Sequence, residues 1–209
     1  NFVLSKLNEF PLLLKLMSVC PLPDLAIEGL LTKLRCSILL NIASLEEASP
    51  KLLKFQLALA LQCFTNEYIY SNTEEEEKIL HSLDVSVSKA LKNKEQPSPQ
   101  MVLVLASYKA LMQYEWYNLL VLTDEIKEVF ICQIEEPNQE ANLKKQLPVL
   151  KEITDSISSE VRAQYEESPY PRWVNLGLPF KPMSISEIVN VVQLKLYDKK
   201  IVEIEEPKI

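Results

Sequence analysis

Apolar residues recur at helical spacing through the first two-thirds of the chain, in runs that follow helix-start signals. After Asp24 they fall at three- and four-residue steps and form one face of a helix. Ser49 followed by Pro50 is typical of a helix start, and the run after it is apolar nearly all round, which predicts a central helix. The apolar positions are Leu25, Ile27, Leu30, Leu31, Leu34, Ile38 and Leu39 in the first run, and Leu52, Leu53, Phe55, Leu57, Leu59, Leu61 and Phe64 in the second.

Similar start signals recur further along the chain. Thr73 followed by four glutamates predicts a capping box with a solvated, acidic first turn. Ser98 is expected to cap a helix that runs to Leu111. Other starts are expected at Thr123, Pro137 and Thr154. The pattern predicts an all-α fold, an irregular or tetratricopeptide-like array of about seven to eight helices, with no repeat of fixed period.

The pattern changes after residue 173. Residues 176–182 predict a loop, and Ser184 with Glu187 predicts a capped helix. Apolar and polar residues then alternate over 200–204, which predicts a short strand-like tail. We expect a helical domain over 1–163, a proline-aromatic segment and loop over 164–183, and a helix and strand over 184–209. Because the chain begins without methionine and stops after this tail, we expect a fragment.

Composition narrows the function classes. The net charge is −7, and arginine occurs only at positions 35, 162 and 172, so a basic face for nucleic acid is not expected. Glycine occurs only at positions 29 and 177, so there is no glycine-rich nucleotide loop. No apolar run is long enough to span a membrane, and no secretion signal is apparent, so we expect a cytoplasmic protein.

Candidate catalytic and metal-binding groups are sparse. The four cysteines stand singly in apolar stretches without a Cys-x-x-Cys pair, which favours buried free thiols over a zinc site. They are Cys20, Cys36, Cys63 and Cys132. The single histidine, His81, has no nucleophile at helical spacing and is expected to be structural. Adjacent glutamates at 135–136, 166–167 and 205–206 diverge in direction on regular structure and are not a specific signal.

Two aromatic groups are candidates for binding. Tyr108, Tyr114, Trp116 and Tyr117 form the first; they suit a ligand pocket, but aromatics at helix ends more often close the core. The second is the segment 164–173, Gln-Tyr-Glu-Glu-Ser-Pro-Tyr-Pro-Arg-Trp. Its two prolines cannot continue a helix, so residues 168–172 are expected to be extended and pre-ordered.

The proline-aromatic segment has two readings on chemistry alone. It suits a rigid flap in which Tyr165, Tyr170 and Trp173 present rings and Arg172 presents a fork for a carboxylate. It equally suits a connector that docks one domain on another, with Trp173 as a plug. The scaffold of the segment is Gln164, Glu166, Pro169 and Pro171.

The same segment resembles the Gln-Tyr-Glu-x-x-Pro-Tyr-Pro-Arg-Trp signature of bacterial S-adenosylmethionine-dependent methyltransferases with a helical, often tetratricopeptide-containing, N-terminal region. Residues 30–35 and 59–68 also look like helices of those proteins. The resemblance implies a catalytic domain after residue 209 that binds S-adenosylmethionine. This chain lacks the glycine turn for that cofactor, so we expect no cofactor and no methyl transfer in the chain alone.

The resemblance implies a non-catalytic N-terminal helical part that presents substrate or covers the cofactor site through Tyr165, Tyr170, Arg172 and Trp173. Its partners would be a methyltransferase domain in cis and a protein or peptide substrate. The methyl acceptor and oligomeric state stay open. The alternative is a stand-alone helical adaptor that binds a peptide in a groove.

Overall fold

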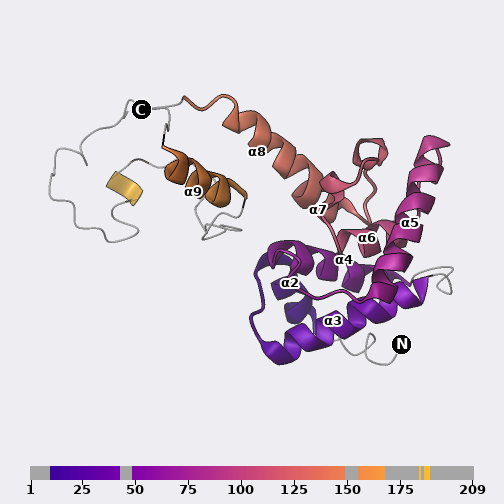
Figure 1. Ribbon diagram of the computed structural model, residues 1–209. Coiled ribbons are helices and arrows are strands. Elements are labelled where there is room, and N and C mark those ends of the chain that lie inside the picture. The colour runs from indigo at the N-terminus through magenta and orange to yellow at the C-terminus, as the bar shows by residue number, and fades with distance from the viewer. Residues whose placement is uncertain (1–9, 43–48, 149–154, 168–183, 185, 189–209) are drawn as a thin grey trace. The chain divides into compact units, whose positions relative to one another are not determined.

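The computed structural model describes residues 10–42, 49–148, 155–167, 184 and 186–188 (Figure 1). The chain divides into two compact units, Asn1–Val174 and Asn175–Ile209. The regular elements among the described residues are all helices, which confirms the all-α fold class. None of these helices is both long enough and apolar enough to cross a membrane.

The first three described helices start where proline or a capping side chain sets the geometry. Helix α2 (Pro11–Val19) has proline in its first turn. Asp24 caps α3 (Leu25–Leu40) and accepts two backbone N–H bonds of 3.0 Å from the first turn. Ser49 caps α4 (Pro50–Thr65). The predicted starts of α3 and α4 are therefore confirmed.

Helix α5 (Glu74–Lys92) opens with the predicted capping box. The Thr73 hydroxyl accepts from the Glu76 N–H, and the Glu76 carboxylate accepts from the Thr73 N–H at 2.9 Å. The expectation of a solvated first turn fails at Glu76, whose residue surface is only 2% exposed. This carboxylate turns inward because a buried hydroxyl donates to it, as the next subsection describes.

Helix α6 (Pro99–Ala106) ends five residues before the expected end at Leu111. In a longer helix the Leu111 N–H would bond to the Ser107 carbonyl. Here the Leu111 N–H donates to the side chain of Gln133 at 3.0 Å, and the Ser107 carbonyl accepts from Arg35. Two short 3₁₀ helices, η2 (Leu111–Gln113) and η3 (Tyr117–Leu119), follow instead.

The next helical run is continuous where the sequence suggested two separate helices. It comprises α7 (Lys127–Phe130), the π-helical segment η4 (Ile131–Glu135) and α8 (Glu136–Lys144). The expected start at Thr123 is wrong, because residues 124–126 form a turn and the helix begins at Lys127 without a side-chain cap. Pro137 has no N–H to donate, and its ring crowds the backbone carbonyl of the residue four positions earlier. The π-helical segment, whose turn is wider than that of an α-helix, ends at Glu135, just before this proline.

Helix α4 lies at the centre of the first unit, as its apolar sequence predicted. It packs against α2, α6 and α7, while α5 packs against α3 and α6. The buried Gln133 side chain bonds three backbone groups of this core: besides accepting from Leu111, it donates to the Ala60 and Ala106 carbonyls at 3.4 and 3.1 Å. Buried polar groups satisfied in this way specify how helices meet.

Helix α9 (Ser156–Glu167) belongs to the same unit. It starts after Asp155, which accepts from the Ser158 N–H at 2.7 Å. In the second unit, Ser184 and Glu187 form the predicted capping box, with Glu187 accepting from the Ser184 N–H at 2.7 Å. The expected strand-like tail over 200–204 lies outside the described residues.

Candidate functional site

The proline-aromatic segment is described only at its start. Gln164, Tyr165 and Glu166 lie on the last turns of α9. The first four residues of the segment are thus helical, and the residues expected to be extended, 168–172, lie outside the described part of the chain. Its remaining site residues, Pro169, Tyr170, Pro171, Arg172 and Trp173, lie outside the described residues, so the expected flap geometry remains a prediction.

Tyr165 and Glu166 of this segment face solvent. Tyr165 is 59% exposed. Glu166 accepts 2.6 Å hydrogen bonds from Lys144 and Arg162, which hold the pKa of its carboxyl below the usual value. Glu166 therefore joins the ends of α8 and α9, and the roles expected of Glu166 and Tyr165 remain predictions.

The other aromatic group closes the core, as the sequence favoured. Tyr108, Tyr114 and Trp116 are each less than 9% exposed. Tyr114 and Trp116 stack with ring centres 4.8 Å apart, and the Trp116 indole N–H donates to Asp84 at 2.6 Å. These rings join the 3₁₀ segment to α5. His81 is exposed on α5, and of the four free cysteines only Cys63 is buried.

Arg35 is a buried charged residue that the sequence did not single out. It is 1% exposed, and its guanidinium donates to the carbonyls of Tyr70 and Ser71 at 3.2 and 2.9 Å and to the Asn72 side chain at 2.9 Å. The same group lies 4.1 Å from the Tyr108 ring centre. The segment that connects α4 to α5 is thereby tied to α3.

Tyr108 connects this cation to Glu76. Its hydroxyl donates to the Glu76 carboxylate at 2.6 Å. Burial alone would raise the pKa of Glu76, but hydrogen bonds from Tyr108 and Thr73, together with the Arg35 charge, lower it below the usual value. Burial and the bond to Glu76 raise the pKa of the Tyr108 hydroxyl, so it stays protonated as a donor. We interpret this network as structural, because its members bond or stack on one another and on backbone groups.

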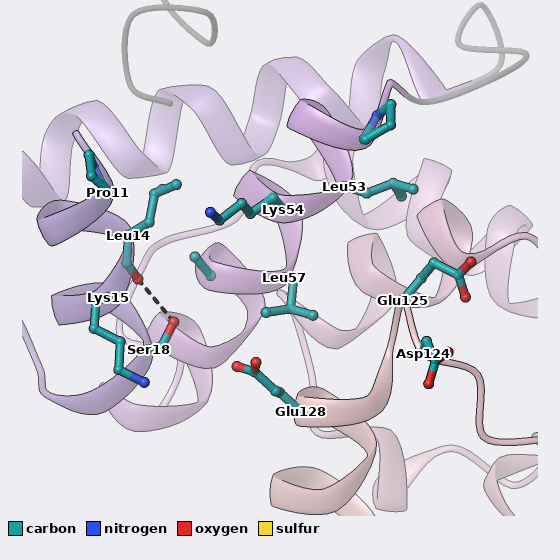
Figure 2. Close-up of a pocket in the computed structure, with 12 residues that line it drawn as sticks. Pro11, Leu14, Lys15, Ser18, Leu53, Lys54, Leu57, Asp124, Glu125 and Glu128 are labelled. Atoms are coloured by element: carbon teal, nitrogen blue, oxygen red, sulfur yellow. Dashed lines mark hydrogen bonds between the residues drawn. The ribbon is translucent and has the colours of Figure 1, made fainter. Parts of the chain in front are cut away.

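An open groove in the first unit is the described feature best suited to binding. It has a volume of about 640 Å³ and is lined by α2, by α4 and by residues 124–128 (Figure 2). Residues one helical turn apart contribute from each helix: Pro11, Leu14, Lys15 and Ser18 from α2, and Pro50, Leu53, Lys54, Leu57 and Ala58 from α4. This volume lies within the range of about 300–1,000 Å³ typical of ligand sites.

The groove combines an apolar floor with charged rims. Leu14 and Ala58 are buried, and Leu53 and Leu57 are half-buried. Three exposed carboxylates come from the stretch 124–128, the third of which reaches toward α2, while two lysines belong to the helices (Figure 2). These are Asp124, Glu125 and Glu128, and Lys15 and Lys54. The arrangement can take an apolar side chain and pair charges on both of its sides.

The groove was not predicted, because helix α2 was not predicted. Its signal is present in the chain: Phe10 precedes Pro11, and Leu13, Leu14 and Met17 follow at helical spacing. Thr123, Asp124 and Glu125 resemble a capping sequence, so the pattern predicts a helix start where the structure has the acidic turn. Only folding brings that turn beside α2 and α4.

A second hollow, of about 720 Å³, lies beside the C-terminal half of α5. Its wall is mainly polar and includes Lys89, Lys92 and Lys109 together with the core aromatics Tyr114 and Trp116. It offers less apolar surface than the α2/α4 groove, so it is the weaker candidate for a peptide.

Comparison of the chain with protein-family models, curated proteins and solved structures finds no match.

Proposed function

We propose that this chain is the non-catalytic helical part of an S-adenosylmethionine-dependent methyltransferase, in which it presents substrate or covers the cofactor site. The observation that carries the proposal is the segment 164–173, which matches the methyltransferase signature at every specified position. Two prolines one residue apart restrict the backbone around Tyr170 and Arg172. Such restriction suits side chains that must be held ready for a ligand.

The roles that we propose for this chain and for the catalytic domain follow from the residue types present. Tyr165, Tyr170 and Trp173 supply aromatic surface, and Arg172 supplies a donor fork that fits a carboxylate such as the one S-adenosylmethionine carries. Glycines stand only at positions 29 and 177, neither within a glycine-rich turn. We therefore assign cofactor binding and methyl transfer to a catalytic domain in cis.

The test uses the product of the complete reading frame that contains this sequence. Calorimetry measures binding of S-adenosylhomocysteine, and tritiated S-adenosylmethionine reports methyl transfer to proteins of a cell extract. The complete product is expected to bind the cofactor product, whereas the chain 1–209 alone is not. Absence of binding by the complete product contradicts the proposal.

Two variants of the complete product distinguish a flap from a substrate-presenting element. If Arg172 and Trp173 cover the cofactor site, Arg172→Ala and Trp173→Ala weaken S-adenosylhomocysteine binding about tenfold or more. If they present substrate, cofactor binding is unchanged and methyl transfer falls. Ser159→Ala, on the exposed surface of α9, is the control and changes neither quantity.

A second candidate function is a helical adaptor that binds a peptide without a catalytic domain. The α2/α4 groove favours it, because the described residues that line this groove come from α2, α4 and the stretch 124–128 and not from the described part of the segment, 164–167. Under this alternative the Arg172→Ala and Trp173→Ala variants bind partner proteins as the wild type does, and the complete product binds no S-adenosylhomocysteine.

A further inference from the structure

We propose that the α2/α4 groove binds a protein segment that presents apolar side chains with lysine or arginine along one flank. The inference goes beyond the proposed function, since a groove that binds such a segment is compatible with a substrate-presenting part of an enzyme and with an adaptor. Two helices with a floor between them can hold either a short helix or an extended chain.

The length of the groove suits a peptide. The lining residues of α4 run from Pro50 to Ala58, and those of α2 from Pro11 to Ser18. At a rise of about 1.5 Å per residue, the α4 wall extends for about 12 Å, which corresponds to about two helical turns. Within that length Leu14, Leu53 and Leu57 can contact two or three apolar side chains of a partner.

The charges define which peptide fits. Asp124, Glu125 and Glu128 are exposed, and none of them is in an ion pair with another described residue, because those pairs are confined to Glu166 with Lys144 and Arg162. An acidic or wholly apolar partner would leave these carboxylates repelled or poorly hydrated. Lysine or arginine on the facing flank would pair with them.

The opposite side of the groove gives the partner an orientation. Lys15 of α2 and Lys54 of α4 lie away from Asp124 and Glu125, whereas Glu128 reaches toward α2 (Figure 2). A segment that is basic on one flank and neutral or acidic on the other matches both sides, whereas the reversed orientation brings like charges together. Like charges opposed across an interface select against wrong partners and registers.

The experiment measures fluorescence anisotropy of labelled 15-residue peptides with the chain 1–209. One peptide has leucines at three- and four-residue steps and lysines along one flank; its partner has glutamates in place of the lysines. The lysine peptide is expected to bind about tenfold more tightly, with affinity that falls as salt rises. Equal binding of the two peptides, or none of either, would overturn the inference.

Charge reversal locates the binding site. Glu125→Lys/Glu128→Lys is expected to weaken binding of the lysine peptide about tenfold. The control, Glu95→Lys/Glu140→Lys, makes the same change in net charge at exposed positions that do not line the groove, and should change affinity less than twofold. An equal loss of affinity in both double variants indicates attraction by net charge alone and contradicts binding of the peptide in the groove.

A third variant tests the floor without changing charge. Ser18→Tyr places a bulky side chain among the lining residues and is expected to reduce binding, with folding checked by circular dichroism.

The methyltransferase proposal and the groove proposal can fail separately. Peptide binding by the chain, with no methyl transfer by the complete product to a protein bearing the lysine peptide, counts against the methyltransferase role alone. Cofactor binding by the complete product without peptide binding counts against the groove alone.

Discussion

The hydroxyl of Tyr108 donates a 2.6 Å hydrogen bond to the carboxylate of Glu76, which lies 32 positions earlier in the chain. The same carboxylate caps the first turn of α5 through Thr73. One side chain therefore fixes both the start of a helix and the position of the segment that follows α6. Arg35 lies against the Tyr108 ring and joins α3 to the same assembly.

Removal of the Tyr108 hydroxyl is expected to destabilise the protein. In Tyr108→Phe the buried Glu76 carboxylate loses a donor, which we expect to lower the free energy of unfolding by about 1–3 kcal/mol. Urea denaturation monitored by circular dichroism measures the change. The matched control is Tyr117→Phe at a half-buried ring, which should shift stability by less than about 0.5 kcal/mol.

The pH dependence of stability gives a separate check on Glu76. Because its folded-state pKa is lowered, this group stabilises the protein above its unfolded pKa, and the contribution is lost as pH falls through the folded value. The stability difference between wild type and Tyr108→Phe should therefore narrow in urea titrations between about pH 5 and pH 3. A stability difference that stays constant over this pH interval contradicts a lowered pKa for the Glu76 carboxyl.

Replacement of Arg35 should be more damaging than replacement of Tyr108. Arg35→Lys keeps the charge but loses the two-pronged guanidinium, in which Nη2 contacts the 70–72 segment while Nη1 contacts the Ser107 carbonyl. We expect a loss of about 3 kcal/mol or more, since an incompletely bonded charge stays buried. Thermal denaturation measures it, with exposed Arg162→Lys as the matched control. A loss below 1 kcal/mol would show that the buried contacts of Arg35 are dispensable.

Gly29 offers a stabilising change. It lies inside α3, where a Cβ atom would meet nothing within 4 Å. Gly29→Ala removes backbone freedom from the unfolded chain and should raise stability by about 0.5–1 kcal/mol. The midpoint of thermal unfolding is expected to rise by about 1–4 °C. A lower midpoint would mean that the added methyl group meets an obstacle absent from this structure.

The cysteines should differ in reactivity in a predictable order. Burial raises the pKa of the Cys63 thiol to about 12 and that of Cys132 to about 11, so few thiolates form near neutral pH. Alkylation with iodoacetamide at pH 8, followed by peptide mass spectrometry, should leave Cys63 unmodified until urea unfolds the protein. Cys132, which is only half-buried, should react slowly in the native state. Rapid native alkylation of Cys63 contradicts its place in the core.

The sequence was sufficient for features set by neighbouring residues. Caps at Asp24, Ser49, Thr73 and Ser98 act within one turn, so they locate helix starts from the sequence alone. The apolar surface of α4 likewise identified the central helix, because a helix apolar on all sides is stable only when neighbours surround it. The signature over 164–173 is also local, and the functional role it suggests is still a prediction.

The tertiary structure decided what depends on residues far apart in the chain. Gln133 bonds Leu111 and Arg35 bonds Ser107, and these contacts end α6 earlier than local pattern predicts. Glu76 is buried because Tyr108 donates to it, which no reading of four consecutive glutamates reveals. The acidic turn at residues 124–128 becomes the rim of a groove only when it lies beside α2 and α4. Helix propensity and capping act over a few residues, whereas burial and pairing of polar groups depend on the completed fold.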